Sequence, residues 1–196
     1  MNPSSIIFGS TSAILFLAIT VMFRVTGVGS TWTWLSGSEN GAVGGVYGTK
    51  GIPSINNYPS GRCCHSMVFD PTLNCVYVFG GEGYAQSGTY GESTSLSRHN
   101  IPALGQVNDL WRFNISNNQW TWLSGSNVVD VNGVSGTKGV PSVDNYPGSR
   151  LEHSMIFDSA VNCIYIFGGW GYSLTGVFGK PNFDDSSYDL WLRSIE

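Results

Sequence analysis

The chain has 196 residues, of which 26 are glycine and only 11% are charged, while aromatic residues make up 13%. This balance favours many short strands joined by glycine turns and speaks against long solvated helices. The net charge of -4, with only nine Lys and Arg residues, leaves no basic stripe to neutralise phosphates. Nucleic acid is therefore excluded as an expected partner.

Residues 1-29 are interpreted as a signal peptide or a membrane anchor. Ala13 to Phe23 is an almost unbroken apolar run, and counting from Ile6 brings it to the lower limit for a membrane-spanning helix. No basic segment precedes the run, and Gly27 and Gly29 offer cleavage points. We expect an N-terminal apolar helix that is cleaved as a signal or retained as an anchor through Ile6 to Phe23; a buried strand or helix is the third alternative. Either of the first two predicts the secretory route, with an extracellular or membrane-anchored protein.

From residue 30 onward the chain is an internal repeat. TWTWLSGS from Thr31 returns as QWTWLSGS from Gln119, and GTKGIPSINNYPSGR from Gly48 returns as GTKGVPSVDNYPGSR from Gly136, both 88 residues later. The offset is only 80 residues for a later motif, since NDLW from Asn108 returns as YDLW from Tyr188. The loop before this motif is therefore shorter in the second repeat. We treat 30-196 as one domain, with repeat 1 at about 31-118 and repeat 2 at about 119-196.

Each repeat predicts two antiparallel hairpins. In the first repeat the four strands are HSMVFD (from His65), NCVYVFGG (from Asn74), NDLWRFNI (from Asn108) and QWTWLSGS (from Gln119). Polar turns at 71-73 and 116-118 separate the strands of each hairpin. A four-stranded sheet of this kind cannot bury both faces alone, so neighbouring copies must stack on it.

These residues resemble the kelch repeat, whose signature is an apolar strand ending in Gly-Gly, a later aromatic position and then a tryptophan. Here the first copy supplies YVFGG, Phe113 and Trp120, and the second supplies YIFGG and Leu192. The resemblance covers about Thr31 to Glu196 and implies an all-β, kelch-type β-propeller segment of about two four-stranded blades, similar to galactose oxidase-like propellers. The positions assigned to the repeat scaffold are Gly80, Gly81, Trp111, Trp120, Gly168, Gly169 and Trp191.

The two ends of the repeat region are complementary, because it opens with a fourth-strand motif (TWTWLSGS) and stops after a third strand (YDLW). In kelch-like propellers a fourth strand from one end commonly completes the blade left open at the other. Two blades do not close a ring, which takes about four to eight. The chain is thus interpreted as a fragment of a longer product, which we favour, as a subunit of a ring built from several copies, or as an open solenoid-like piece.

Two long connections, Gly37 to Gly61 and Glu82 to Val107, are predicted to leave the first sheet at one end, which we expect to be the binding face. Aromatic rings beside polar groups there suit a protein or glycan ligand. The candidates are Glu82, Tyr84, Tyr90, Arg98, His99, Glu152, Trp170 and Tyr172. At two pairs of equivalent positions the copies carry different side chains although the residues around them match. Glu82 corresponds to Trp170, and Cys64 corresponds to Glu152. By contrast, Arg62 with Arg150 and His65 with His153 recur, which indicates scaffold contacts.

The cysteines and one asparagine bear on the expected secretory route. Asn114-Ile115-Ser116 is a glycosylation sequon in a polar turn, so Asn114 is the expected glycosylation site. Cys75 and Cys163 occupy equivalent apolar positions and are expected in the core. Cys63 and Cys64 are a local addition of the first repeat, and the sequence does not decide their pairing.

The function expected from these features is that of a non-catalytic binding module. Three histidines in all, and no nucleophile paired with a base, predict no catalytic residues, no metal and no cofactor. The first alternative is a portion of a galactose oxidase-like enzyme, whose family holds copper with histidines and tyrosines; Tyr84, Tyr172 and His99 are the nearest candidates, although the pattern is not matched. The second alternative is a truncated repeat without a ligand. Expected partners are a protein or glycan, and either further copies of the chain or further repeats of a longer one.

Overall fold

The computed structural model describes residues 31-86, 103-172 and 189-195, and every regular element in these ranges is a β-strand. The chain divides into two units, Met1–Thr33 and Trp34–Glu196, and the fold described below belongs to the second. The apolar helix expected at 6-23 lies outside the described residues. Within the described ranges, no helix is long and apolar enough to cross a membrane.

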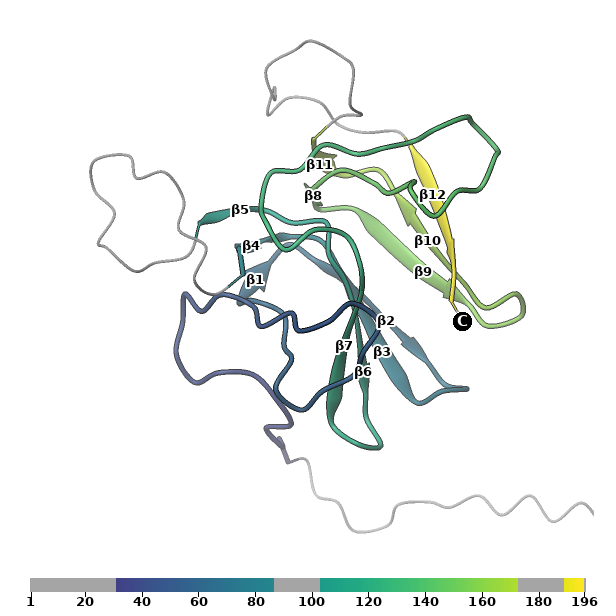
Figure 1. Ribbon diagram of the computed structural model, residues 1–196. Helices are drawn as coiled ribbons and strands as arrows, with labels where there is room; N and C mark the ends of the chain where they lie inside the picture. The colour runs from purple at the N-terminus through teal and green to yellow at the C-terminus, as the bar shows by residue number, and fades with distance from the viewer. Residues whose placement is uncertain (1–30, 87–102, 173–188, 196) are drawn as a thin grey trace, which may run out of the picture. The chain divides into compact units, whose positions relative to one another are not determined.

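The larger sheet, here called the N-terminal sheet, is four-stranded and antiparallel (Figure 1). Its strands, in spatial order, are β2 (Ser66–Asp70), β3 (Cys75–Phe79), β6 (Leu110–Asn114) and β7 (Gln119–Ser124). These are the two hairpins that the first repeat predicts. The turns use asparagine where the backbone becomes left-handed, with φ of 51° at Asn74 and 56° at Asn118, because asparagine tolerates that conformation better than most side chains.

The second repeat forms the C-terminal sheet, with β12 (Leu190–Ser194), β10 (Cys163–Phe167) and β9 (Ser154–Asp158) in that order. The third strand is thus where the YDLW motif predicts it. Among the described residues no fourth strand pairs with β12. The strand expected at residues 31-38 is not formed: this segment is irregular, and Trp32 is 100% exposed. Its near copy at β7 already occupies the edge of β6, which is the fourth-strand position of the N-terminal sheet.

Two smaller sheets lie where the long connections begin. β1 (Arg62–Cys63), β4 (Glu82–Tyr84) and β5 (Leu104–Gln106) make one of them, and β8 (Arg150–Leu151) with β11 (Trp170–Gly171) makes the other. In register, Cys63 faces Glu82 and Leu151 faces Trp170. Glu82 and Trp170, which differ between the copies, therefore occupy equivalent positions in the two small sheets.

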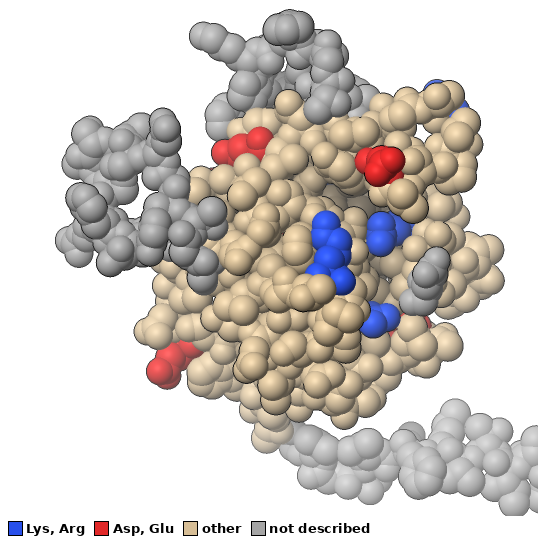
Figure 2. Space-filling model, in the orientation of Figure 1, with Lys and Arg blue, Asp and Glu red and all other residues tan. Residues whose placement is uncertain are grey.

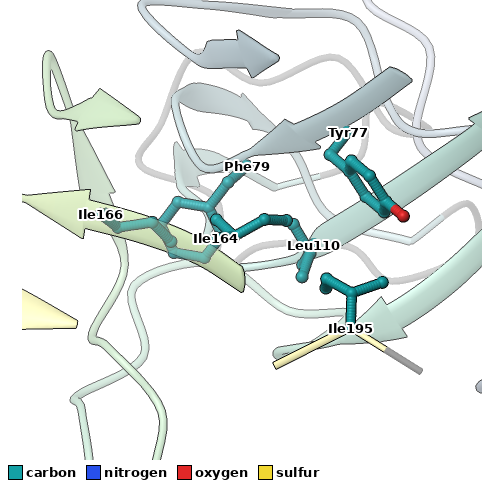
Figure 3. Close-up of a cluster of buried hydrophobic side chains, with 6 residues drawn as sticks. All are labelled: Tyr77, Phe79, Leu110, Ile164, Ile166 and Ile195. Atoms are coloured by element: carbon teal, nitrogen blue, oxygen red, sulfur yellow. The ribbon is translucent and has the colours of Figure 1, made fainter. Parts of the chain in front are cut away.

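The two main sheets pack face to face. Figure 3 shows the centre of the contact, where Tyr77, Phe79 and Leu110 of the N-terminal sheet meet Ile164, Ile166 and Ile195 of the second repeat. Each of these side chains is at most 6% exposed, and burying one such side chain contributes about 1.5–3 kcal/mol. The contact between the sheets is therefore the main apolar core of the described chain.

The connection that precedes β1 departs from the expected arrangement. Part of it runs along the outer edge of β7, where the amides of Gly51 and Ser54 donate to the carbonyls of Trp122 (2.8 Å) and Trp120 (3.1 Å). Lys50 lies over the Trp122 ring, with Nζ 4.2 Å from the centroid. This segment therefore protects a sheet edge, and only the remainder of the connection is available to the expected binding face.

Candidate functional site

A buried ion-pair network anchors the strands that lead to the candidate site. The Arg62 guanidinium donates from Nη1 to Asp109 Oδ1 (2.6 Å) and from Nη2 to Asp109 Oδ2 (2.8 Å). The Tyr47 hydroxyl (2.6 Å) and the Trp111 indole N–H (2.7 Å) donate to Oδ2 of the same carboxylate. Burial acts to raise the pKa of Asp109, but the Arg62 charge and these donors hold it below its usual range. The carboxylate stays ionised inside the protein.

The second repeat rebuilds this network. Arg150 donates to the two carboxylate oxygens of Asp189 at 2.6 and 3.0 Å, and the Trp191 indole N–H donates to the same group at 2.6 Å. The two arginines are therefore scaffold contacts, as their recurrence indicates. Their aspartate partners, Asp109 and Asp189, were not predicted from the sequence, although the Asp-Leu-Trp shared by the NDLW and YDLW motifs was the available signal.

The two repeat-equivalent histidines lie in different surroundings. His153 is 6% exposed and packs edge-on to Phe79, with ring centroids 5.1 Å apart. Burial, followed by the Arg150 charge, lowers the pKa of His153 to about 4. His65, its counterpart, is exposed. His153 thus acts as a scaffold residue between the sheets, whereas the expectation of a scaffold contact at His65 is not met within this chain.

We define the candidate site, called the junction patch, as Cys63, Cys64, Glu82, Glu152 and Trp170; Trp170 pairs with Leu151, the residue that precedes Glu152. The Cys63 sulfur lies 3.9 Å from Glu82 Oε2. The Glu152 amide donates to the Cys64 carbonyl at 3.0 Å, which joins the two repeats at this point. All five residues are exposed, including 47% of Trp170.

The backbone of the junction patch is the same in both repeats although its side chains differ. Cys64 and Glu152 both adopt a left-handed conformation, with φ of 56° and 55°. The pKa of the Cys64 thiol is raised, first by its S–H contact with the Cys63 sulfur (3.5 Å) and further by the nearby Glu152 and Glu82 carboxylates. Cys64 is accordingly a neutral thiol beside two carboxylates, an arrangement that suits hydrogen bonding better than nucleophilic attack.

The remaining predicted ligand residues are more widely spread. Tyr84 is half-buried on β4. Burial, and then a hydrogen bond to Asp130, raise the pKa of Tyr172 to about 12, so its hydroxyl is already engaged. Tyr90, Arg98 and His99 lie outside the described residues. Asn114 ends β6, and its side-chain oxygen accepts from the Ser116 amide at 2.9 Å; its glycosylation remains a prediction.

Charge is sparse on the surface as well as in the sequence. On the face drawn in Figure 2, Lys, Arg, Asp and Glu occupy only a few places and the other side chains cover most of it. Within the described ranges, no group of three or more His, Cys, Asp or Glu residues is placed to hold a metal ion. The junction patch presents one indole, two carboxylates and two thiols.

No model of a known protein family matches this sequence, and no curated protein is found to be similar to it.

Proposed function

We propose that the chain is a kelch-like β-propeller segment of the secretory pathway that acts as a non-catalytic binding module. Its ligand would be a protein or glycan, bound at the junction patch outside the cytoplasm. The four-stranded antiparallel sheet, the face-to-face packing of the two repeats and the Gly-Gly pair after each second strand support the propeller assignment.

The observation that carries the binding proposal is side-chain divergence on a conserved frame. Glu82 and Trp170 occupy equivalent strand positions, and Cys64 and Glu152 share one backbone conformation. A stability role favours the same side chain in each copy, as the two Arg–Asp pairs illustrate. Exposed side chains that differ on the same frame are instead suited to recognition.

The chemistry of the junction patch favours a glycan. The half-exposed ring of Trp170 offers an apolar face on which the C–H face of a sugar can stack, while Glu82 and Glu152 can accept hydrogen bonds from its hydroxyl groups. Because the two carboxylates lie close enough to Cys64 to raise its pKa together, they form one negative region. Neutral and amine-bearing sugars fit this region, and strongly anionic ones do not.

The test is a glycan array probed with the full chain, followed by calorimetric titration of the best ligand. Trp170→Ala should weaken binding at least about tenfold and Glu152→Gln by several fold, since truncating an aromatic hot-spot residue costs about 2 kcal/mol or more. Val161→Ala, in the exposed turn between β9 and β10, should leave affinity unchanged.

Two results would contradict the proposal. The site would be wrong if a ligand were found whose affinity is insensitive to both substitutions. The binding function itself would be wrong if neither the array nor a panel of secreted proteins yielded a ligand, a result that favours the ligand-free alternative.

A further inference from the structure

The C-terminal sheet buries one face and exposes apolar side chains on the other. On the N-terminal sheet the corresponding face is exposed along β2, while Val78 and Trp111 on the same face are buried beside Tyr47. On the N-terminal sheet, Met67 is 64% exposed and Phe69 is 52% exposed. On the C-terminal sheet, Phe167 is 51% exposed and Leu190 is 65% exposed. Met67 and Phe69 lie on the edge strand β2, and Phe167 and Leu190 lie on the neighbouring strands β10 and β12. Exposed apolar side chains grouped in this way are typical of a surface that another molecule covers.

The internal repeat identifies what these faces fit. Met155 and Phe157 of the second repeat, the counterparts of Met67 and Phe69, pack into the core between the sheets. The counterparts of Phe167 and Leu190 are Phe79 and Leu110, and both are only 2% exposed in that same core. The exposed face of the C-terminal sheet and the exposed β2 side of the N-terminal sheet therefore correspond to surfaces that meet in the contact the chain already makes between its own repeats.

The polar contacts between the repeats have counterparts that make no such contact within the described part of the chain. Within the chain, the Gly81 amide donates to the Arg150 carbonyl (2.8 Å), and the Ser66 hydroxyl donates to the His153 carbonyl (2.5 Å). The corresponding donors on the C-terminal sheet are Gly169 and Ser154. The corresponding acceptors are the carbonyls of Arg62 and His65 on the N-terminal sheet.

The ring of His65 fits the same scheme. Its counterpart, His153, packs on Phe79, and the counterpart of Phe79 is the exposed Phe167. His65 is itself exposed, so that a neighbouring copy would supply the missing partner of each ring.

We propose that a second copy of this chain docks head to tail on the first. The N-terminal sheet of one copy packs, through Met67, Phe69 and His65, on Phe167 and Leu190 of the C-terminal sheet of its neighbour. A contact between two different faces of the same molecule is heterologous, and it closes into a ring or continues as a filament depending on the rotation per copy. The inference does not depend on the proposed ligand.

The segment at 31-38 is consistent with this arrangement. Its counterpart strand β7 meets the C-terminal sheet where Arg193 donates to the Ser124 hydroxyl (3.3 Å). Ser36, the counterpart of Ser124, accepts from the Trp120 indole (2.9 Å) on the N-terminal sheet. In the proposed assembly, this segment would reach the place where the preceding copy presents the edge of its β12 strand. There it would supply the fourth strand of that copy's C-terminal sheet.

The test uses the full chain and measures mass by light scattering over a range of concentrations. The wild-type chain should assemble beyond a dimer. Phe167→Asp and Met67→Asp should each give a monomer, because each leaves one intact face but no complementary one. Both side chains are exposed, so the folded monomer should survive, with an unchanged far-ultraviolet circular dichroism spectrum. Val161→Asp introduces the same charge outside both faces and should assemble like the wild type.

Mixing the two variants provides the decisive measurement. Phe167→Asp keeps a working N-terminal face and Met67→Asp keeps a working C-terminal face, so an equimolar mixture should form a dimer with one copy of each and stop there. Association through the apolar residues at 6-23 would be unaffected by either substitution. A wild-type chain that remains monomeric at about 100 μM, far above the Kd of a specific complex, would overturn the proposal. So would variants that retain the wild-type mass, or a mixture that forms no dimer.

Discussion

At the scale of single residues, the two arginine–aspartate pairs share one geometry but differ in burial. The side chains of Arg62 and Asp109 are 4% and 0% exposed, whereas those of Arg150 and Asp189 are 2% and 32% exposed. Removing one partner of a buried pair leaves an uncompensated charge in a medium of low polarity. The penalty therefore depends on whether water can replace the missing partner.

We predict that Asp109→Ala lowers the free energy of unfolding by about 3–5 kcal/mol, the range for breaking a buried pair. Asp189→Ala should cost less, roughly 1–2 kcal/mol, because solvent reaches its side of the pair and screens the charge left behind. Urea titrations of the two variants measure the difference.

Asp109→Asn is the control, since it keeps the shape and part of the hydrogen bonding. It should fall between the wild type and the alanine variant. Equal losses for the two alanine variants would contradict the argument from burial.

At the scale of the elements, the glycine pair that ends β3 makes a close approach to β1. Gly81 has φ of 97°, and a Cβ at this position would collide with the Cys63 carbonyl oxygen and lie 3.0 Å from His65 Cβ. Gly139 has a similar φ of 80°, in an exposed connection with nothing within 4 Å of such a Cβ. Alanine substitution at Gly139 therefore measures the cost of backbone strain alone, and substitution at Gly81 adds the cost of the steric clash.

Gly139→Ala should destabilise the protein by about 1–2 kcal/mol, the cost of a left-handed alanine. Gly81→Ala should cost at least about 2 kcal/mol more, since it adds a clash with backbone that cannot move independently. Thermal unfolding of both variants checks this. Similar melting temperatures would mean that β1 shifts to make room.

The strands could be predicted from sequence because the evidence for them is local. Alternating apolar residues and asparagine turns specify the hairpins β2–β3 and β6–β7. Residues 31-38 carry nearly the same letters as β7 and yet form no strand, because strand formation depends on a free neighbouring edge, which a sequence does not display. The sequence also does not show that Gly51 and Ser54 pair with the outer edge of β7. The whole connection before β1 was therefore expected at the binding face.

The candidate site could be predicted only in part. Comparing the copies picked out Glu82, Trp170, Cys64 and Glu152. The structure brings Glu82 against Cys63 and Glu152 against Cys64, and it pairs Trp170 with Leu151. The Asp109 network was missed because a buried polar cluster is assembled by residues distant in sequence, and its members resemble surface residues when read singly.

At the scale of the whole molecule, the contact between the two repeats contains a titratable ring. His153 lies in that contact, and its pKa of about 4 is below the ordinary value of 6.5, first because of burial and then because of Arg150; His65 adds a smaller repulsion. The unfolded chain therefore binds a proton at this residue before the folded chain does. Stability contributed by neutral His153 is complete above pH 6.5, declines as the pH falls towards 4 and is constant below that.

We predict that between pH 7 and pH 4.5 the wild-type chain loses about 2 kcal/mol more unfolding free energy than His153→Phe, as follows from the conversion of about 1.4 kcal/mol per pKa unit. Comparing the two proteins cancels the carboxylates that titrate in the same range. His65→Phe is the matched control: its pKa is also lowered, by burial and then by Arg62, but it is exposed, so its substitution should remove much less of the pH dependence. Parallel pH profiles for the wild type and His153→Phe would mean that the ring accepts a proton without separating the sheets. In that case the contact between the repeats, and with it the contact proposed between copies, would be more hydrated than its burial indicates.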